Sequence, residues 1–299
     1  MSRLSVGVVL PASRTAASDV RACARHAEDL GLDALFTGDH LAAATPTLDS
    51  GLTLATAAAV TKRLRMGFGV MILALRHPAW AAKQIATLQH LSGNRVILGI
   101  GTGGAVHGTA AWDAVGVPYA ERGQRTDAAL DLLPGLMAGR PVRMASGTSI
   151  TLAPAAQMPP VWVGGGSRAA LRRAARYGDS WFPSMITAEM AARGRRQLAD
   201  LAAGHGRPLP HLAVGGSVLL GPAPSASALR DATAGIIRYG VNPRDAPQIP
   251  ITGTPAQAAE RFWRYAEAGV SHLILGVIGD DWRHQCELIA ETRELAGQP

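Results

Sequence analysis

Cysteine is scarce in this chain of 299 residues, and long apolar runs are absent from it. The only cysteines are Cys23 and Cys286, each in a segment predicted to be helical, which excludes a disulfide framework. No apolar stretch approaches the roughly 18 residues of a membrane-spanning helix. The N-terminus lacks the apolar core and the cleavage site of a signal peptide. We therefore expect a soluble, cytoplasmic protein without a membrane partner.

Lysine is equally rare, since it occurs only as Lys62 and Lys83 among the 29 basic residues behind the net charge of +7. The arginines are scattered along predicted helices, whereas a nucleic-acid-binding face would gather them in a run or stripe. Nucleic acid is therefore not an expected partner, although a positive field favours a small anionic ligand. Hydrophobic residues make up 47% of the chain and charged residues 17%, which excludes general disorder.

Short apolar runs alternate with helical patterns along the whole chain. Continuous apolar runs are typical of parallel strands buried on both faces. Eight such strand–helix units in 299 residues favour a closed (β/α)8 barrel over an open sheet. We expect one α/β domain, residues 1–299, with the TIM-barrel fold. The expected strands are 4–10, 34–37, 66–73, 95–101, 161–163, 180–182, 212–220 and 273–278, and the expected helices are 20–30, 52–60, 78–91, 126–137, 169–176, 187–203, 254–268 and 282–295.

Three stretches interrupt this alternation and predict insertion loops at the C-terminal face of the barrel: 41–51, 104–123 and 240–252. A fourth, 140–151, predicts a hairpin that turns at Ser146-Gly147. In barrels of this kind the chemistry lies at the C-terminal ends of the strands and in the loops that follow them. Functional residues are therefore sought there. Trp80 and Trp112 are expected to pack in the core or at its rim, and the alternative is that they line a pocket.

Asp39 and His40 end the second expected strand. A histidine at that position can exchange a proton near neutral pH, and a carboxylate can orient it or bind a ligand amide. The alternative is an aspartate that caps the following turn beside a partly exposed histidine. The spacing does not decide between the two.

Gly164, Gly165, Gly166 and Ser167 follow a strand and open a helix. Glycine lets backbone N–H groups approach a ligand, and a helix N-terminus carries partial positive charge. The pattern indicates a phosphate site with the Ser167 hydroxyl as a further donor. The alternative is a tight turn in which Ser167 only caps the helix.

The segment from Gly99 to Gly104 fits the dinucleotide fingerprint G-x-G-x-x-G only formally. That fingerprint requires a helix that opens at once, and His107-Gly108 and Val117-Pro118 interrupt one here. A glycine-lined wall for a flat ring is the better interpretation, and a simple loop is the alternative. The nine histidines are dispersed and no metal-binding motif occurs, so no metal is expected. His272 precedes the last strand, at the end that barrels use for stability.

Taken together, these segments resemble the bacterial-luciferase-like superfamily of flavin- and deazaflavin-dependent oxidoreductases. The resemblance covers essentially the whole chain. It implies a TIM-type barrel, a homodimer, and a non-proline cis peptide at Gly69-Val70 that forms a bulge behind the cofactor ring. The stretches that carry the resemblance are 31–40, 75–78, 86–93, 99–103, 118–123, 161–167 and 174–179.

The Asp39-His40 pair resembles the branch of that superfamily that uses coenzyme F420, a deazaflavin. This implies that Asp39 contacts the cofactor or holds His40, and that His40 serves the substrate as acid or base. It also implies ring or ribityl contacts by Ile72, Thr102, Gly103 and His107, a phosphate site at Gly164–Ser167, and a substrate cavity formed by the three insertion loops. A deazaflavin transfers hydride and does little oxygen chemistry.

The chain departs from the sugar-phosphate dehydrogenases of this branch, which place a tryptophan shortly after the histidine and a glutamate after the Thr-Gly pair. Ala44 and Gly104 stand there instead, which makes sugar-phosphate oxidation an unexpected activity. The expected reaction is hydride transfer to a small-molecule substrate with an activated C=C, C=N or C=O bond. The alternatives are an FMN-dependent two-component monooxygenase of the same fold and a non-catalytic flavin- or deazaflavin-binding protein.

Overall fold

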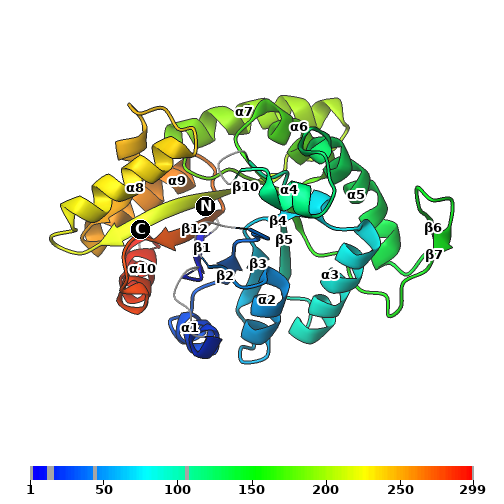
Figure 1. Cartoon of the computed structure of the whole chain (residues 1–299). Coiled ribbons are helices and arrows are strands. Elements are labelled where there is room, and N and C mark those ends of the chain that lie inside the picture. Colours follow the sequence, from blue (N-terminus) through cyan, green and yellow to red (C-terminus); the bar gives the residue numbers. More distant parts are fainter. Residues whose placement is uncertain (1–2, 12–16, 43–45, 105–107, 298–299) are drawn as a thin grey trace.

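Eight parallel strands close into a barrel in the computed structural model of the chain, and helices surround it (Figure 1). The structure describes residues 3–11, 17–42, 46–104 and 108–297. The TIM-barrel fold expected from the alternating pattern is therefore confirmed. The strands are β1 Ser5–Val9, β2 Ala34–Thr37, β3 Arg65–Phe68, β4 Met71–Ile72, β5 Val96–Gly101, β6 Val142–Arg143, β7 Ser149–Ile150, β8 Val161–Gly164, β9 Ser180–Phe182, β10 His211–Leu220, β11 Ile251–Gly253 and β12 His272–Val277.

The helices follow the strands on the outside of the barrel and cover it on all sides (Figure 1). They are α1 Ala17–Asp29, α2 Ser50–Ala58, α3 Pro78–Ser92, α4 Ala110–Ala114, α5 Arg122–Met137, α6 Arg168–Tyr177, α7 Ala188–Gly204, α8 Ala226–Arg238, α9 Pro255–Glu267 and α10 Trp282–Ala296, with 3-10 turns at Leu73–Leu75, Tyr119–Glu121 and Ala246–Gln248.

The strand order proves that the barrel is closed. The order is β1-β2-β3-β5-β8-β9-β10-β12, and β12 pairs again with β1. Every one of these pairings is parallel, so the carboxyl ends of all eight strands meet at one rim. That common rim is where the candidate residues of the second, third, fourth and fifth expected strands must come together.

The barrel interior is filled by side chains that alternate with outward-facing ones along each strand. Phe36 lies at its centre, with its ring centroid 5.6 Å from those of Trp162 and Phe182. Gly67 lies opposite this ring, where a Cβ atom would collide with it. The interior cluster comprises Ala34, Phe36, Ile97, Trp162, Phe182, Ala213 and Ile274, with Val9 and Val70 packed on it.

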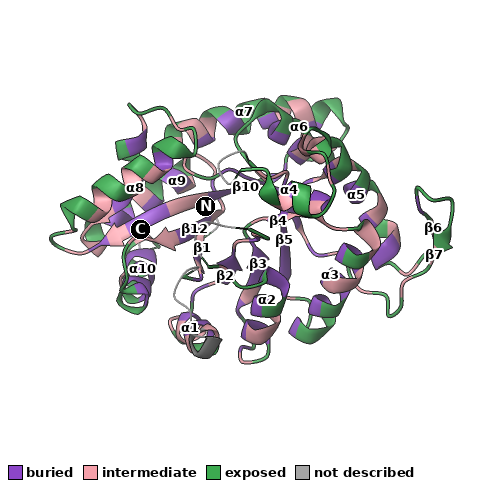
Figure 2. Cartoon of the chain, in the orientation of Figure 1, coloured by how far each residue is buried: buried purple, intermediate pink, exposed green. Residues whose placement is uncertain are grey.

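A second, larger apolar layer lies between the strands and the helices, and the outer helix faces are exposed (Figure 2). Many helix starts have the side-chain caps that their sequences indicate. Asp49, Thr187 and Thr254 accept hydrogen bonds from the backbone N–H groups of their first turns. The left-handed Gly93 ends α3 in the same predictable way.

Several features of the fold differ from the expected elements, among them the short helix α4 inside the expected loop 104–123. The third strand is split, because Gly69-Val70 interrupts it and its last part forms a 3-10 turn. The helix α8 was not expected; only Ile236 of it is buried, so its sequence carries little apolar periodicity. Within the stretch 240–252, the structure places a 3-10 turn and the start of β11, which pairs with β10.

Other expectations are confirmed. The hairpin at 140–151 forms as β6 and β7, turns through Gly147 with φ of 85°, and projects away from the barrel beyond α5 (Figure 1). Trp112 is buried, as expected, but Trp80 is 75% exposed on α3. The expectation that Trp80 packs in the core or rim was therefore wrong, because α3 turns that position outward; Trp80 lines a surface pocket between α2 and α3 instead, which was the alternative.

Within the described ranges, no helix is both long and apolar enough to cross a membrane. The same residues contain no group of three or more His, Cys, Asp or Glu side chains that could hold a metal ion.

Candidate functional site

The predicted site residues converge at the carboxyl rim of four neighbouring strands, β2, β3 with β4, β5 and β8. Asp39 and His40 follow β2, and Ile72 lies in β4. Thr102 and Gly103 follow β5, and Gly164 ends β8. His107 and Ala44 lie outside the described residues.

The Gly69-Val70 peptide is cis, as the family resemblance implied. It forms a bulge: β3 pairs Gly67 with Ile97, whereas β4 pairs Met71 with Ile100, so the pairing shifts by one residue between them. The N–H of Gly69 donates to the carbonyl oxygen of Thr37 over 2.8 Å, and Gly69 itself is exposed. The bulge therefore presents its backbone at the rim.

The Val70 side chain packs directly against glycines of the neighbouring strands β5 and β8. A Cβ atom at Gly164 would lie 3.0 Å from Val70 Cγ1, and one at Gly101 would collide with Val70 Cγ2. At Gly99 a Cβ atom would collide with the carbonyl oxygen of Phe68. The glycines of β5 and β8 thus allow close approach of the bulged strand. This explains the G-x-G pattern without a dinucleotide, since the next helix, α4, begins only at Ala110.

Asp39 is buried, at 6% exposure, and both of its carboxylate oxygens accept hydrogen bonds. The two outer nitrogens of Arg76 donate to it over 2.6 and 2.7 Å. Ser50 Oγ donates over 2.8 Å and the backbone N–H of Ile72 over 2.9 Å. Asp39 therefore ties the end of β2 to the start of α2 and to β4. Its predicted contact with a cofactor or with His40 stays a prediction.

His40 is half-buried beside this carboxylate. Its ring folds back over the chain, because a Cβ atom at Gly38 would lie 3.3 Å from both Cδ2 and Nε2 of His40. The absence of a side chain at Gly38 gives the imidazole this room. A histidine placed at the rim in this way is suited to proton exchange with a bound molecule.

Thr102 and Gly103 follow β5, and the aromatic ring of Trp112 packs against Gly103. Gly103 has φ of 70°, and a Cβ atom there would lie 2.7 Å from the buried ring of Trp112. Trp112 contacts Tyr119 edge to face at 5.5 Å, and the Arg122 guanidinium lies 3.9 Å from the Tyr119 ring centroid. Trp112 thus packs against the Gly103 turn, and Tyr119 and Arg122 stack in sequence behind it.

The turn from Gly164 to Ser167 is exposed from Gly165 onward and opens α6. Ser167 Oγ accepts a hydrogen bond of 3.2 Å from the N–H of Ala170, so Ser167 is the helix cap of the alternative interpretation. Its hydroxyl proton remains able to donate to an anion. Trp181 Nε1 donates to the Gly165 carbonyl oxygen over 2.8 Å and fixes the turn. Cap and anion site are therefore compatible.

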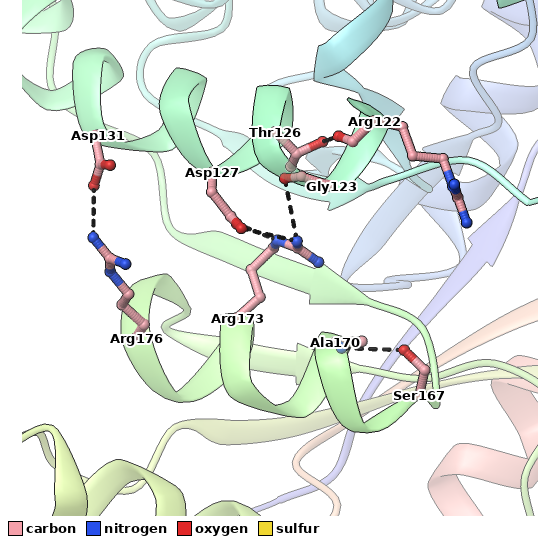
Figure 3. A network of polar contacts seen from close by, with 9 residues as sticks. All are labelled: Arg122, Gly123, Thr126, Asp127, Asp131, Ser167, Ala170, Arg173 and Arg176. Atoms are coloured by element: carbon pink, nitrogen blue, oxygen red, sulfur yellow. Dashed lines mark hydrogen bonds and ion pairs between the residues drawn. The ribbon is translucent and has the colours of Figure 1, made fainter. Parts of the chain in front are cut away.

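Ion pairs anchor α6 to α5 behind this turn (Figure 3). Arg173 Nε pairs with Asp127 Oδ1 at 2.5 Å, and another of its nitrogens donates to the Gly123 carbonyl oxygen over 3.3 Å. Arg176 pairs with Asp131 at 3.4 Å. Arg173 thus holds the middle of α6 against α5, whereas Arg176 pairs near the C-terminal end of α6, away from the N-terminus that would face an anion.

Sequence reasoning missed Arg76 and Ser50. Arg76 stands in the Leu75–Pro78 stretch that carried part of the resemblance, which was the available signal. Ser50 offers no comparable signal, because a lone serine before a helix indicates only a cap.

His272 lies apart from the site, at the amino end of β12, as expected. Its ring packs edge to face on Trp162 with centroids 4.8 Å apart. Burial lowers the pKa of His272 to about 4, and the charges of Arg65 and His211 act in the same direction. The imidazole is therefore neutral near pH 7, and it packs against Trp162 of the barrel interior.

The family model for luciferase-like monooxygenases matches residues 4–268. The chain belongs to this family. The closed barrel with its bulged third strand is the fold that the family resemblance implied.

Known proteins agree with this membership. The luciferase-like chain is 40% identical over 146 residues to an uncharacterized protein of Mycobacterium tuberculosis (strain ATCC 25618 / H37Rv), covering 46% of this chain and 48% of that protein. It thus spans about half the length of that relative. It is 28% identical over 321 residues to an F420-dependent glucose-6-phosphate dehydrogenase of Beutenbergia cavernae, covering 91% and 90% of the two chains. An F420-dependent secondary alcohol dehydrogenase with an F420-acetone adduct has the same fold, with a TM-score of 0.83, 18% identity and coverage of 99% and 100%.

Proposed function

We propose that this luciferase-like chain is an F420-dependent oxidoreductase that transfers hydride between the deazaflavin and an organic substrate. One observation carries the proposal: Val70 packs on the glycines of β5 and β8 and, with the exposed Gly69, lies at the rim where His40 follows β2. A flat ring fits against such a backbone wall. The relatives named as F420-dependent support this choice of cofactor.

The residues at the rim fit the two ends of such a cofactor. Gly69, Val70, Ile72, Thr102 and Gly103 would hold its ring and ribityl chain. The exposed N–H groups of Gly165 and Gly166, together with the Ser167 hydroxyl, would hold its phosphate at the N-terminus of α6. His107 would contact the ring as well.

When bound, the deazaflavin supplies a hydride from C5 of its ring. His40 would donate a proton to the substrate atom that does not receive the hydride, so that a C=C, C=N or C=O bond gains two electrons and two hydrogens. Asp39, held by Arg76 and Ser50, would keep the His40 turn in place. Reduction is the proposed direction; oxidation of an alcohol would use the same residues in reverse.

Gly104 bears on the class of substrate. A Cβ atom there would meet no atom within 4 Å, so the position is open where sugar-phosphate dehydrogenases place a glutamate. We propose a substrate larger than a sugar phosphate. Ala44 lies outside the described residues and adds nothing structural to this point.

The rival function is an FMN-dependent monooxygenase, which the description of the matching family favours. The purified chain should be titrated with F420 and with FMN, each oxidised and reduced, while fluorescence quenching is recorded. The proposal predicts saturable binding of F420 that is tighter than that of FMN. Tight FMN binding without F420 binding would reverse the ranking. Tight F420 binding with no turnover across a broad set of activated alkenes, imines and carbonyls would indicate a carrier.

We also propose that the chain forms a homodimer through the outer face of α2 and α3. Leu52, Trp80 and Leu91 are 72%, 75% and 62% exposed there and border a groove of about 490 Å³. The helix α2 carries no charged residue. The basic residues of α3, Lys83 and His90, bond to the carbonyl oxygens of Ala153 and Ala155. Arg76 and Lys83 also line the groove, but each is held by an acceptor of its own chain, so the exposed apolar side chains can meet those of a second copy.

Few cysteines and the absence of a disulfide framework in the sequence support the cytoplasm as the proposed compartment.

A further inference from the structure

We propose that Arg76 is a positioning residue of the site: it holds Asp39 so that the carboxylate fixes the backbone of Ile72 beside the bulge at Gly69-Val70. The geometric part of this inference stands on the described contacts alone. Its consequence for cofactor binding rests on the proposed function.

The contact between Arg76 and Asp39 is a two-point one. One outer guanidinium nitrogen donates to Oδ2 over 2.6 Å and the other to Oδ1 over 2.7 Å. Paired N–H groups in a rigid fork fix the orientation of a carboxylate as well as its position. A lysine at this position would supply the charge at a single point and lose that orientation.

The burial of Asp39 makes this pairing necessary. The Asp39 side chain is 6% exposed, and that of Arg76 is 22% exposed. Without the guanidinium, the donors that remain to the charged oxygens among the described residues are the Ser50 hydroxyl and the Ile72 N–H. A buried carboxylate that loses its cation rearranges or takes up a proton, and either change alters what it holds.

Asp39 holds the backbone N–H of Ile72, which follows the Gly69-Val70 bulge that is proposed to lie behind the cofactor ring. The Ile72 N–H donates to Oδ2 over 2.9 Å, and Ile72 stands two residues after Val70. The Ile72 side chain also reaches the Thr102-Gly103 turn, since its Cδ1 is 3.5 Å from the Cβ position of Gly103. Arg76 thus acts through Asp39 on two of the predicted contact surfaces for the ring. On its other side it borders the α2–α3 groove.

Three variants and one control test this role: Arg76→Gln, Arg76→Lys, Ser50→Ala, and Arg176→Gln. Arg176 provides the control because it also pairs with an aspartate, but on the exposed face of α6. Two measurements are made on each purified chain. Hydrogen–deuterium exchange is followed at the Ile72 amide, and F420 affinity is measured by fluorescence quenching well below the unfolding temperature.

In Arg76→Gln we expect faster exchange at Ile72, unchanged exchange in β12, and F420 affinity lower by about tenfold, a typical loss when an outer support of a bound group is removed. Arg76→Lys should recover part of both effects. Ser50→Ala should change both in the same direction but less, and Arg176→Gln should change neither.

The inference is overturned if Arg76→Gln keeps the wild-type exchange at Ile72 and the wild-type F420 affinity. It is also overturned if exchange accelerates equally in β12, since that result shows a global stability role. If Arg76→Gln does not fold, unchanged Ile72 exchange in both Arg76→Lys and Ser50→Ala overturns it. Failure of the wild-type chain to bind F420 defeats the proposed function instead, and exchange at Ile72 then still decides the role of Arg76.

Discussion

Val70 occupies the space that a side chain at Gly101 would need, because a Cβ atom at Gly101 would collide with Val70 Cγ2. Val70 belongs to the bulge between β3 and β4, and Gly101 is the last residue of the neighbouring strand β5. The bulge can take this position only because residue 101 has no side chain. The relationship explains a glycine pattern that, in the sequence alone, resembles a nucleotide fingerprint.

Gly101→Ala should therefore displace Val70 and weaken F420 binding by at least about tenfold, since misplacing a preorganised contact surface costs affinity. Gly204→Ala is the matched control, because a Cβ atom at Gly204 would meet nothing within 4 Å. Fluorescence titration of both variants measures the effect. Equal affinities in the two variants would show that Val70 does not back the ring.

His40→Asn should lower turnover by roughly 10²–10⁴-fold while F420 affinity changes little, as expected for loss of a general acid or base. His284→Asn, an exposed histidine on α10, provides the control. Steady-state rates with the best acceptor from the substrate screen, measured at saturating cofactor, check the prediction. A turnover equal to that of the wild type would remove His40 from the mechanism.

Ser167→Ala removes both a helix cap and a proposed phosphate donor. It should lower the free energy of unfolding by about 1 kcal/mol and also lower F420 affinity. Ser225→Ala removes a similar cap from α8, where Ser225 Oγ accepts from the Ala228 N–H over 3.3 Å. That control should lose stability without losing affinity. Denaturant unfolding and cofactor titration separate the two effects, and a parallel loss of affinity in both variants contradicts the phosphate role.

His272 should make the folded chain less stable in acid. Burial lowers its pKa from 6.5 to about 4, so between these pH values the unfolded chain binds a proton that the folded chain does not. Above about pH 6.5 the imidazole is neutral in both states and costs no stability. As the pH falls toward 4, proton uptake by the unfolded chain lowers the free energy of unfolding. Urea unfolding at several pH values should show this decline, and a shallower one in His272→Asn. Identical pH profiles for the two chains contradict it.

Trp80→Glu should convert the proposed homodimer to a monomer, because a charge on each copy would be buried against the other. Light scattering coupled to size-exclusion chromatography gives the mass of the wild type and the variant. Trp263→Glu, which changes an exposed tryptophan of α9, is the control. A monomeric wild-type chain would end the dimer proposal.

Much of the fold could be predicted from sequence, because buried parallel strands and capped helices leave local signals. Residues 34–37 and 180–182 form strands with the expected bounds. The cis peptide at Gly69-Val70 came from the family resemblance, since no local pattern around it indicates a cis bond. The helix α8 escaped prediction because it buries a single large side chain and so lacks periodicity.

The partners of Asp39 could not be predicted. Arg76 lies 37 positions away in the chain and Ser50 lies 11 away, and nothing in either segment shows that it turns toward β2. Such contacts depend on the closure of the barrel, which brings β2, β4 and α2 to one place. The exposure of Trp80 is a related case, since it depends on which face of α3 the barrel covers.

Arg76 lines the α2–α3 groove on the outside of the barrel and also binds Asp39 at the rim that carries the candidate site. A compound that filled the groove beside Trp80 and Leu91 and pulled this guanidinium outward would weaken cofactor binding from a distance, and it would have to displace the second copy of the proposed homodimer. The outer surface therefore offers a way to lower cofactor affinity with a molecule that does not occupy the rim.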